Sequence, residues 1–314
     1  MSNSPKIVYG GYPFGLLPHE DSSKIVEVLK KSGIRELDTA RIYPGSEKAI
    51  GELHLPEQFV IDTKARGFTD GSLTKKGIEE SIAESLDLLG VESVEIFYLH
   101  CPDRDTEIEE ETIDAINELH QQGKFKKFGL SNFPAKDVEQ VYNYAKSKGY
   151  VLPTVYQGNY NAVARRSESE LFPLLRKLNI AFYAYSPIAG GFLARSVDDI
   201  KNGEGRFDPN TPVGQIYLKL YSRPALLTAL DEWDKLAQKV GTSKARLAYR
   251  WVVHNSVLSG KFGDAVIIGG RNADQVTDTA EAISEGPLPA NIVSEIDKLW
   301  EKIKDEAPLD NYSF

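Results

Sequence analysis

The stretch Glu36-Leu37-Asp38-Thr39-Ala40-Arg41-Ile42-Tyr43 joins a short apolar run, an acid that closes the run and a tyrosine five positions later. If the run is a β-strand, Asp38 lies at its C-terminal end and Tyr43 in the loop above it. A carboxylate in that place requires a cation, and a tyrosine beside such a pair is a candidate proton donor. The role of this stretch therefore depends on the partners that neighbouring strands bring to Asp38.

Apolar runs of the same kind recur along the chain, and amphipathic helical patterns separate them. Strands are expected at 7–11, 35–39, 58–64, 93–100, 125–131, 154–157, 180–185 and 265–269. Helices are expected at 21–31, 44–53, 74–89, 106–122, 135–148, 167–178, 225–240, 242–254, 273–283 and 289–303. Strands that alternate with helices are typical of parallel βαβ units. Eight such units in 314 residues predict a closed (β/α)8 barrel, the TIM-barrel fold.

The alternative fold is an open, doubly wound sheet. Dinucleotide-binding sheets of that kind usually carry Gly-x-Gly-x-x-Gly after the first strand. Here the first run ends in Gly10-Gly11-Tyr12-Pro13-Phe14-Gly15, which does not have that spacing. No internal repeat or interdomain linker is apparent. We therefore predict one domain over residues 1–314, with a long irregular loop at 190–224 after the seventh strand and helices towards the C-terminus.

The composition is that of a globular protein, with 41% hydrophobic and 26% charged residues. The formal net charge of −9 argues against nucleic acid as a partner, because duplex binding requires a basic surface. The single cysteine, Cys101, cannot form an internal disulfide, and the polar N-terminus has no signal-peptide core. No apolar run approaches the ~20 residues of a membrane span. These features predict a cytoplasmic protein without a membrane partner.

Three successive strands end in Asp38, Lys64 and His100, at the rim where barrels of this kind carry their active sites. Adjacent strands lie about 4.8 Å apart, so Asp38 and Lys64 can pair. Each feature also has a purely structural interpretation. Asp38 and Lys64 can form an ion pair that closes the rim, His100 can cap the strand end, and Tyr43 can be a packed aromatic residue. Together they form an acid site. The charge of Lys64 is expected to lower the pKa of Tyr43 from about 10, and a neutral His100 can orient a carbonyl oxygen.

Reduction of a carbonyl also requires a hydride, which no side chain supplies, so a reductase of this design needs a nicotinamide cofactor. The rim offers candidates to hold a carboxamide, to stack on a nicotinamide ring and to approach a pyrophosphate: Ser131, Asn132 and Gln157, then Tyr185, then Gly190 and Gly191. Each has a plainer structural reading, as a turn former or a core residue. Their shared position on the rim is what favours a role in binding.

The order of Asp38, Tyr43, Lys64 and His100 resembles the catalytic tetrad of the aldo-keto reductase superfamily. Ser131-Asn132-Phe133 and Tyr185-Ser186-Pro187 resemble further segments of that family. Longer segments are most similar to its aflatoxin-aldehyde reductase branch, at 97–103, 152–158, 160–162, 189–191, 205–207, 263–267 and 285–288.

This resemblance implies an NADPH-dependent reductase of aldehydes and some ketones, with direct hydride transfer, Tyr43 as the acid and no metal. The implied cofactor-binding residues are Asp38, Ser131, Asn132, Gln157, Tyr185, Ser186, Pro187, Gly190, Gly191, Leu193, Arg206, Gly270, Arg271 and Gln275. An arginine suits the 2′-phosphate of NADPH because its planar fork makes paired, charge-assisted hydrogen bonds. The sequence leaves open whether Arg206 or Arg271 has that role.

The chain departs from branch members that act on small carboxylated aldehydes. They have arginines where this chain has Leu218-Lys219-Leu220 and, at the C-terminus, Ser313-Phe314. We therefore expect an aromatic or neutral aldehyde as substrate, although Lys219 or Arg223 are alternatives for binding a carboxylate. The substrate-binding candidates are Tyr12, Tyr43, His100, Tyr217 and Tyr221.

Two further expectations rest on the resemblance. The resemblance to the aflatoxin-aldehyde reductase branch suggests that the protein forms a homodimer. Some barrels of the superfamily bind NADPH and regulate a membrane channel without catalysis, which is the alternative function.

Overall fold

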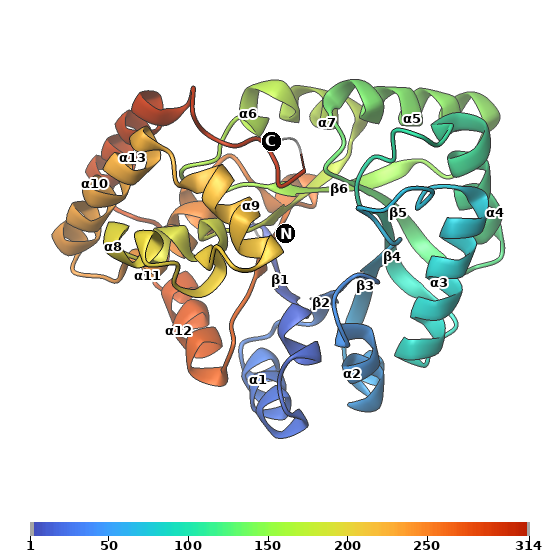
Figure 1. Cartoon of the computed structure of the whole chain (residues 1–314), viewed down its shortest axis with the longest axis horizontal. Helices are drawn as coiled ribbons and strands as arrows, with labels where there is room; N and C mark the ends of the chain where they lie inside the picture. Colours follow the sequence, from blue (N-terminus) through green and yellow to red (C-terminus); the bar gives the residue numbers. More distant parts are fainter. Residues whose placement is uncertain (1–2, 313–314) are drawn as a thin grey trace.

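The computed structural model describes residues 3–312 and forms a closed barrel of eight parallel strands, which pair in the order of the sequence (Figure 1). The strands are β1 (Lys6–Gly10), β2 (Glu36–Asp38), β3 (Val60–Lys64), β4 (Val94–Leu99), β5 (Phe125–Ser131), β6 (Pro153–Asn159), β7 (Ala181–Tyr185) and β8 (Ala265–Ile268). β1 pairs with β8 and closes the ring. The predicted (β/α)8 fold is confirmed.

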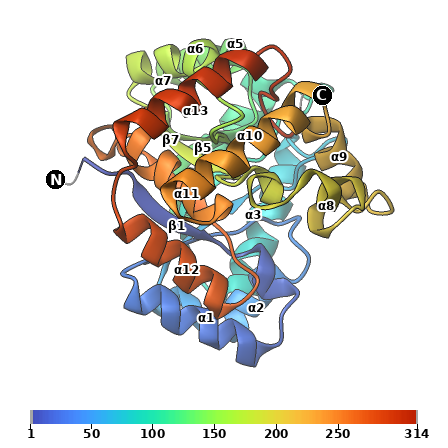
Figure 2. The same ribbon diagram turned by 90° about the vertical axis from the view of Figure 1, so that its left-hand side faces the viewer.

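The helices lie outside the barrel and cover it. They are α1 (His19–Lys31), α2 (Ser46–Glu52), α3 (Lys75–Leu89), α4 (Asp114–Gln121), α5 (Ala135–Lys148), α6 (Ser167–Glu170), α7 (Phe172–Leu178), α8 (Val197–Lys201), α9 (Pro212–Tyr221), α10 (Pro224–Val240), α11 (Lys244–Arg250), α12 (Ala273–Ser284) and α13 (Ala290–Ile303). α10 packs on α13, and α12 packs on both α11 and α1 (Figure 2). No helix within residues 3–312 is long and apolar enough to span a membrane.

Four predicted helices differ from the observed ones. Residues 167–178 form two helices, because Pro173 has no N–H to donate to the carbonyl of residue 169 and Leu171 leaves the helical region at φ −131°. A π-helical turn, Ile108–Ile113, precedes α4, and another, Trp251–Asn255, follows α11. α1 begins at His19, two residues before its predicted start.

The segment predicted as an irregular loop, 190–224, is largely helical. α8 begins with a capping box in which Ser196 and Asp199 satisfy each other's backbone N–H groups. α9 begins with Thr211, which accepts from the N–H of Gly214, and has Pro212 at its first position. Short 3₁₀ turns at Ala189–Ala194 and Gly205–Phe207 complete the segment. The capping signals were present in the sequence, but the many Gly, Pro and Asp residues obscured them.

Side chains fill the inside of the barrel. Its apolar part consists of Val8, Ile96, Tyr98, Val155, Ala181, Tyr183, Ala265 and Ile267. Asp62 is buried beside them, and burial together with the charges of Glu36 and Asp38 raises the pKa of Asp62 well above its usual value. Burial of this carboxyl group thus favours its protonated form. The larger core lies between the barrel and its helices, which leaves the C-terminal rim of the strands as the place for a site.

Candidate active site

Lys64 and Asp38 form a buried ion pair at the ends of adjacent strands. Lys64 Nζ lies 2.6 Å from Asp38 Oδ1 and 2.7 Å from Oδ2, and it also donates to the carbonyl of Thr39 at 2.7 Å. The side chains of Lys64 and Asp38 are 0% and 4% exposed. Gln157 Nε2 donates to Asp38 Oδ1 at 2.7 Å. Since all three ammonium protons can be satisfied, the cation is held in one position.

Tyr43 lies beside this pair, in the loop after β2. Lys64 Nζ is 5.4 Å from the centroid of the Tyr43 ring, and Tyr12 packs edge-on against that ring at 5.3 Å. Burial and the charge of Asp38 raise the pKa of Tyr43, while the charge of Arg206 lowers it. The expectation that Lys64 would bring this pKa below its usual value was wrong. Burial is the largest cause, and the charge of Asp38 adds to it.

His100 follows β4 on the other side of Tyr43. The two ring centroids are 6.1 Å apart, and the backbone carbonyl of His100 accepts from Asn132 Nδ2 at 3.0 Å. Burial, then the charge of Lys64, lowers the pKa of His100 well below its usual value, so the ring is neutral at neutral pH. Its Nδ1 atom is buried without a hydrogen-bond partner among residues 3–312. The four tetrad candidates thus converge on one side of the rim.

The candidates for nicotinamide binding also meet at this rim. Asn132, at φ 61°, donates to Ser131 Oγ at 3.1 Å and accepts from the hydroxyl of Tyr185 at 2.7 Å. The N–H of Asn311, near the C-terminus, donates to the same hydroxyl at 3.2 Å. These bonds fix Asn132 and the Tyr185 ring in place. They also bring the C-terminal segment back across the rim.

The segment after β7 is held by tight packing at two glycines. A Cβ on Gly190 would lie 1.9 Å from the Tyr217 ring, and a Cβ on Gly191 would lie 2.3 Å from the Arg195 guanidinium. Both residues have positive φ. At Gly190 the Tyr217 ring therefore excludes a side chain, and at Gly191 a side chain would displace the end of Arg195. Leu193 is fully buried, so it has no accessible surface in this structure.

Ser186 and Pro187 connect β7 to this segment. Ser186 has φ 54°, its hydroxyl lies 3.3 Å from that of Tyr217, and its carbonyl accepts from Asn161 Nδ2 at 3.0 Å. Pro187 follows in the turn that leads to the first 3₁₀ turn. This short connection thus fixes Tyr217 over the rim.

Two of the substrate-binding candidates are less accessible than expected. Tyr221 is fully buried, bonded to Asn159 at 3.2 Å and stacked on Tyr217 at 6.1 Å, so it supports the wall of the site and does not contact a substrate. Tyr217 is buried to about the same extent as His100, and its hydroxyl accepts from Arg206 at 3.1 Å. Tyr12, Tyr43, His100 and Tyr217 therefore stay candidates for substrate contact. The sequence could not separate these cases because all five are aromatic residues near the rim.

Arg206 and Arg271, the two candidates for the 2′-phosphate, lie in different surroundings. The Arg206 guanidinium is 5.7 Å from the Tyr12 ring and 5.6 Å from the Tyr217 ring, and it donates to the Tyr217 hydroxyl at 3.1 Å. It therefore belongs to the side of the site that carries Tyr43. The backbone N–H of Arg271 donates to Gln275 Oε1 at 2.8 Å near the start of α12.

Gly270, another residue predicted to bind the cofactor, directly precedes Arg271. Its carbonyl accepts from the hydroxyl of Tyr9 at 2.9 Å, and a Cβ on Gly270 would lie 2.7 Å from Val276. The turn after β8 therefore packs closely on α12, and Gln275 holds its backbone. This packing fixes where the Arg271 side chain begins.

Arg195 is a residue that the sequence analysis missed. Burial, followed by the charge of Arg271, lowers the pKa of Arg195, while the charges of Glu204 and Asp199 raise it. Arg195 Nη1 donates to the carbonyl of Gly191 at 3.2 Å, and a Cβ on Gly205 would lie 2.2 Å from Nη2. Among residues 3–312, neither arginine forms an ion pair with a carboxylate. Its position four residues after Gly191 was the available signal.

The chain matches known proteins over nearly its whole length. The model of the Aldo/keto reductase family matches residues 6–301. Oxidoreductase sirO of Leptosphaeria maculans is 41% identical over 95% of this chain and 91% of its own. Aldo-keto reductase family 7 member A3 of Homo sapiens is 36% identical over 97% of this chain and 96% of its own. Aflatoxin B1 aldehyde reductase member 2 of Rattus norvegicus is 38% identical over 91% of this chain and 82% of its own. The chain thus belongs to the aldo/keto reductase family and is an oxidoreductase.

Proposed function

We propose that this protein reduces aldehydes, and some ketones, to alcohols with NADPH. The observation that carries the proposal is the buried pair of Lys64 and Asp38, at 2.6 Å, beside Tyr43 and a neutral His100. This combination can protonate an oxygen on which negative charge develops. The relatives described above bear names of reductases or oxidoreductases, which favours an enzyme over the non-catalytic channel subunit.

Tyr43 is the proposed general acid. Its raised pKa keeps the hydroxyl protonated at neutral pH, so a proton is available for the carbonyl oxygen. The cations Lys64 and Arg206 stabilise the phenolate that remains, and Asp38 holds Lys64 in place. His100 donates a hydrogen bond that orients the carbonyl. When bound, NADPH supplies the hydride for the carbonyl carbon.

The residues around the rim fit a phosphorylated dinucleotide. Arg271 lowers the pKa of Arg195, and the more distant charges of Glu204 and Asp199 raise it, but no carboxylate among the described residues forms an ion pair with either arginine, so both would be free to bind a phosphate. We assign the 2′-phosphate to this pair. Arg206 then remains beside Tyr43. Asn132, Gln157 and Tyr185 are the proposed neighbours of the nicotinamide, with Ser131 behind Asn132.

The test is an assay of the purified protein with NADPH and 4-nitrobenzaldehyde. We expect loss of NADPH absorbance together with formation of 4-nitrobenzyl alcohol, one molecule for each NADPH oxidised. The Tyr43→Phe protein is the control for background reduction. Turnover of the native protein no faster than that control would refute the proposal. A cytoplasmic location and a homodimer stay predictions, and light scattering during gel filtration would test the latter.

A further inference from the structure

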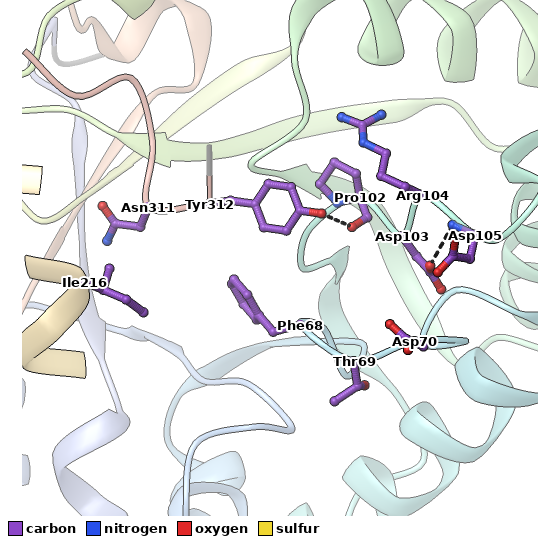
Figure 3. Close-up of a pocket in the computed structure, with 10 residues that line it drawn as sticks. All are labelled: Phe68, Thr69, Asp70, Pro102, Asp103, Arg104, Asp105, Ile216, Asn311 and Tyr312. Carbon is purple, nitrogen blue, oxygen red and sulfur yellow. Dashed lines mark hydrogen bonds between the residues drawn. The ribbon is translucent and has the colours of Figure 1, made fainter. Parts of the chain in front are cut away.

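A cavity of about 360 Å³ adjoins the candidate active site (Figure 3). This volume lies within the roughly 300–1,000 Å³ of small-molecule sites. Loops after β3 and β4, helix α9 and the C-terminal segment contribute its lining: Phe68, Thr69, Asp70, Pro102, Asp103, Arg104, Asp105, Ile216, Asn311 and Tyr312. None of these residues is among the cofactor or substrate candidates predicted from the sequence.

Phe68 connects the cavity to His100. The centroids of the two rings are 5.2 Å apart and the rings meet edge to face. Gly67 allows this approach, because a Cβ there would lie 2.9 Å from His100 Cβ. The backbone N–H of Phe68 also donates to Cys101 Sγ at 3.3 Å. A ligand carbonyl at His100 would therefore have the rest of its molecule beside Phe68.

Phe68 has an unfavourable backbone conformation. Its φ is 64°, a left-handed conformation that bulky residues rarely adopt, and 50% of its surface is exposed. Tyr312 approaches it at 5.9 Å and is fixed by donating its hydroxyl to the carbonyl of Pro102 at 3.0 Å. Figure 3 shows both rings projecting into the cavity. The apolar wall is thus two aromatic rings, completed by Ile216 of α9.

The charged part of the lining is acidic. Asp70, Asp103 and Asp105 lie on one side of the two rings (Figure 3). Burial favours protonation of Asp103, but hydrogen bonds from Thr106 and from backbone N–H groups outweigh it and lower the pKa of Asp103. The lone cation of the lining, Arg104, forms an ion pair with Asp137 at 2.6 Å. The cavity therefore presents uncompensated negative charge.

We propose that this cavity binds the planar, uncharged part of an aromatic aldehyde against Phe68 and Tyr312, and that its aspartates select against aldehydes that carry a carboxylate. The proposal rests on the proposed carbonyl reduction and names the class of substrate for it. Stacking on an aromatic ring favours planar groups. Two exposed carboxylates near the ligand repel an anion without affecting a neutral molecule of the same shape.

The charge part is tested with two aldehydes of nearly equal shape, the neutral 4-nitrobenzaldehyde and the anionic 4-carboxybenzaldehyde. The measured quantity is the ratio of kcat/KM for the anionic aldehyde to that for the neutral one. In the Asp70→Asn/Asp105→Asn double variant we expect this ratio to rise about fivefold over the native protein. Intrinsic reactivities cancel, because the same two aldehydes are compared in both proteins. In the native protein, added salt should raise the ratio as well.

Asp87→Asn is the matched control, since Asp87 is an exposed residue of α3 that lines a different groove. Its ratio should equal that of the native protein. An unchanged ratio in the double variant overturns the charge part, provided that 4-nitrobenzaldehyde is reduced. If neither aldehyde is reduced, the proposed function fails first and this proposal fails with it.

The aromatic part is tested at Phe68. Phe68→Leu keeps an apolar, non-glycine residue but removes the ring, and we expect kcat/KM for 4-nitrobenzaldehyde to fall about fivefold relative to that for propanal. Phe68→Tyr keeps the ring and should retain the native preference. Equal losses for both aldehydes in Phe68→Leu would show that the ring does not bind the substrate.

Discussion

Lys64 Nζ lies within 2.7 Å of both carboxylate oxygens of Asp38, and neither side chain has appreciable contact with solvent. Removal of one partner leaves the other charge buried and unpaired, which costs about 3–5 kcal/mol of folding stability. The Lys64→Met variant should therefore unfold at lower denaturant concentration. Its turnover should fall at least ~100-fold, as expected for loss of a group that supports proton transfer.

The Lys64→Met/Asp38→Asn double variant separates these two effects. It has no buried charge at this place, so it should recover part of the lost stability in urea unfolding but none of the turnover. Calorimetric titration should show that Lys64→Met still binds NADPH. Turnover close to native in either variant would contradict the role given to Lys64.

His100 links stability to pH. Its pKa is well below the value near 6.5 expected in the unfolded chain, so below pH ~6.5 the unfolded state binds a proton that the folded state does not. The stability that His100 contributes is present above pH ~6.5 and is lost as the pH falls towards the folded-state pKa. Urea midpoints of His100→Gln should depend less on pH than those of the native protein between about 6.5 and 5. Parallel curves for the two proteins would argue against a neutral, buried His100.

The pair of Arg195 and Arg271 is proposed to select NADPH over NADH. Arg195→Ala and Arg271→Ala should each weaken binding of NADPH about 10–100-fold, the loss expected for charge-assisted bonds to a phosphate, and weaken NADH much less. Arg206→Ala should affect both cofactors equally and lower turnover. Lys31→Ala, an exposed charge on α1, is the control for nonspecific electrostatics. Equal losses of NADPH and NADH in Arg195→Ala would refute the assignment.

A substitution at Gly191 tests whether the position of the Arg195 guanidinium matters for NADPH binding. A Cβ on Gly191 would overlap the Arg195 guanidinium at 2.3 Å, so Gly191→Ala should weaken NADPH binding as Arg195→Ala does. Gly33 also has positive φ, at 73°, but a Cβ there meets nothing within 4 Å. Gly33→Ala should therefore cost about 1 kcal/mol of stability from backbone strain and leave NADPH affinity intact. Similar NADPH affinity in Gly191→Ala and Gly33→Ala would show that NADPH binding does not depend on the observed position of the Arg195 guanidinium.

Local patterns were sufficient to predict the barrel. Apolar runs and helical periodicity placed all eight strands, and the polar residues that close β2, β3 and β4 identified Asp38, Lys64 and His100 as neighbours. The register of adjacent parallel strands converts sequence order into spatial order, which is why this part of the site could be predicted.

The remaining features depend on contacts between segments distant in sequence. Burial raises the pKa of Tyr43 above its usual value. The cation that lowers this pKa is Arg206, from the segment after β7. Tyr221 is distinguished from Tyr12 only by the layers packed over it. Arg195 becomes a candidate only when Gly191, Gly205 and Arg271 surround it. Periodicity contains no information on such contacts.

Tyr43 is proposed to deliver the proton, while the other residues bind and orient the cofactor and the substrate. The most direct test of this role is the single-turnover rate of 4-nitrobenzaldehyde reduction at saturating NADPH, in the native protein and in Tyr43→Phe, with NADPH affinity measured for both. We predict a rate at least ~100-fold lower in Tyr43→Phe, with NADPH affinity unchanged. A Tyr43→Phe protein that binds NADPH normally and reduces the aldehyde at the native rate would show that Tyr43 is not the proton donor.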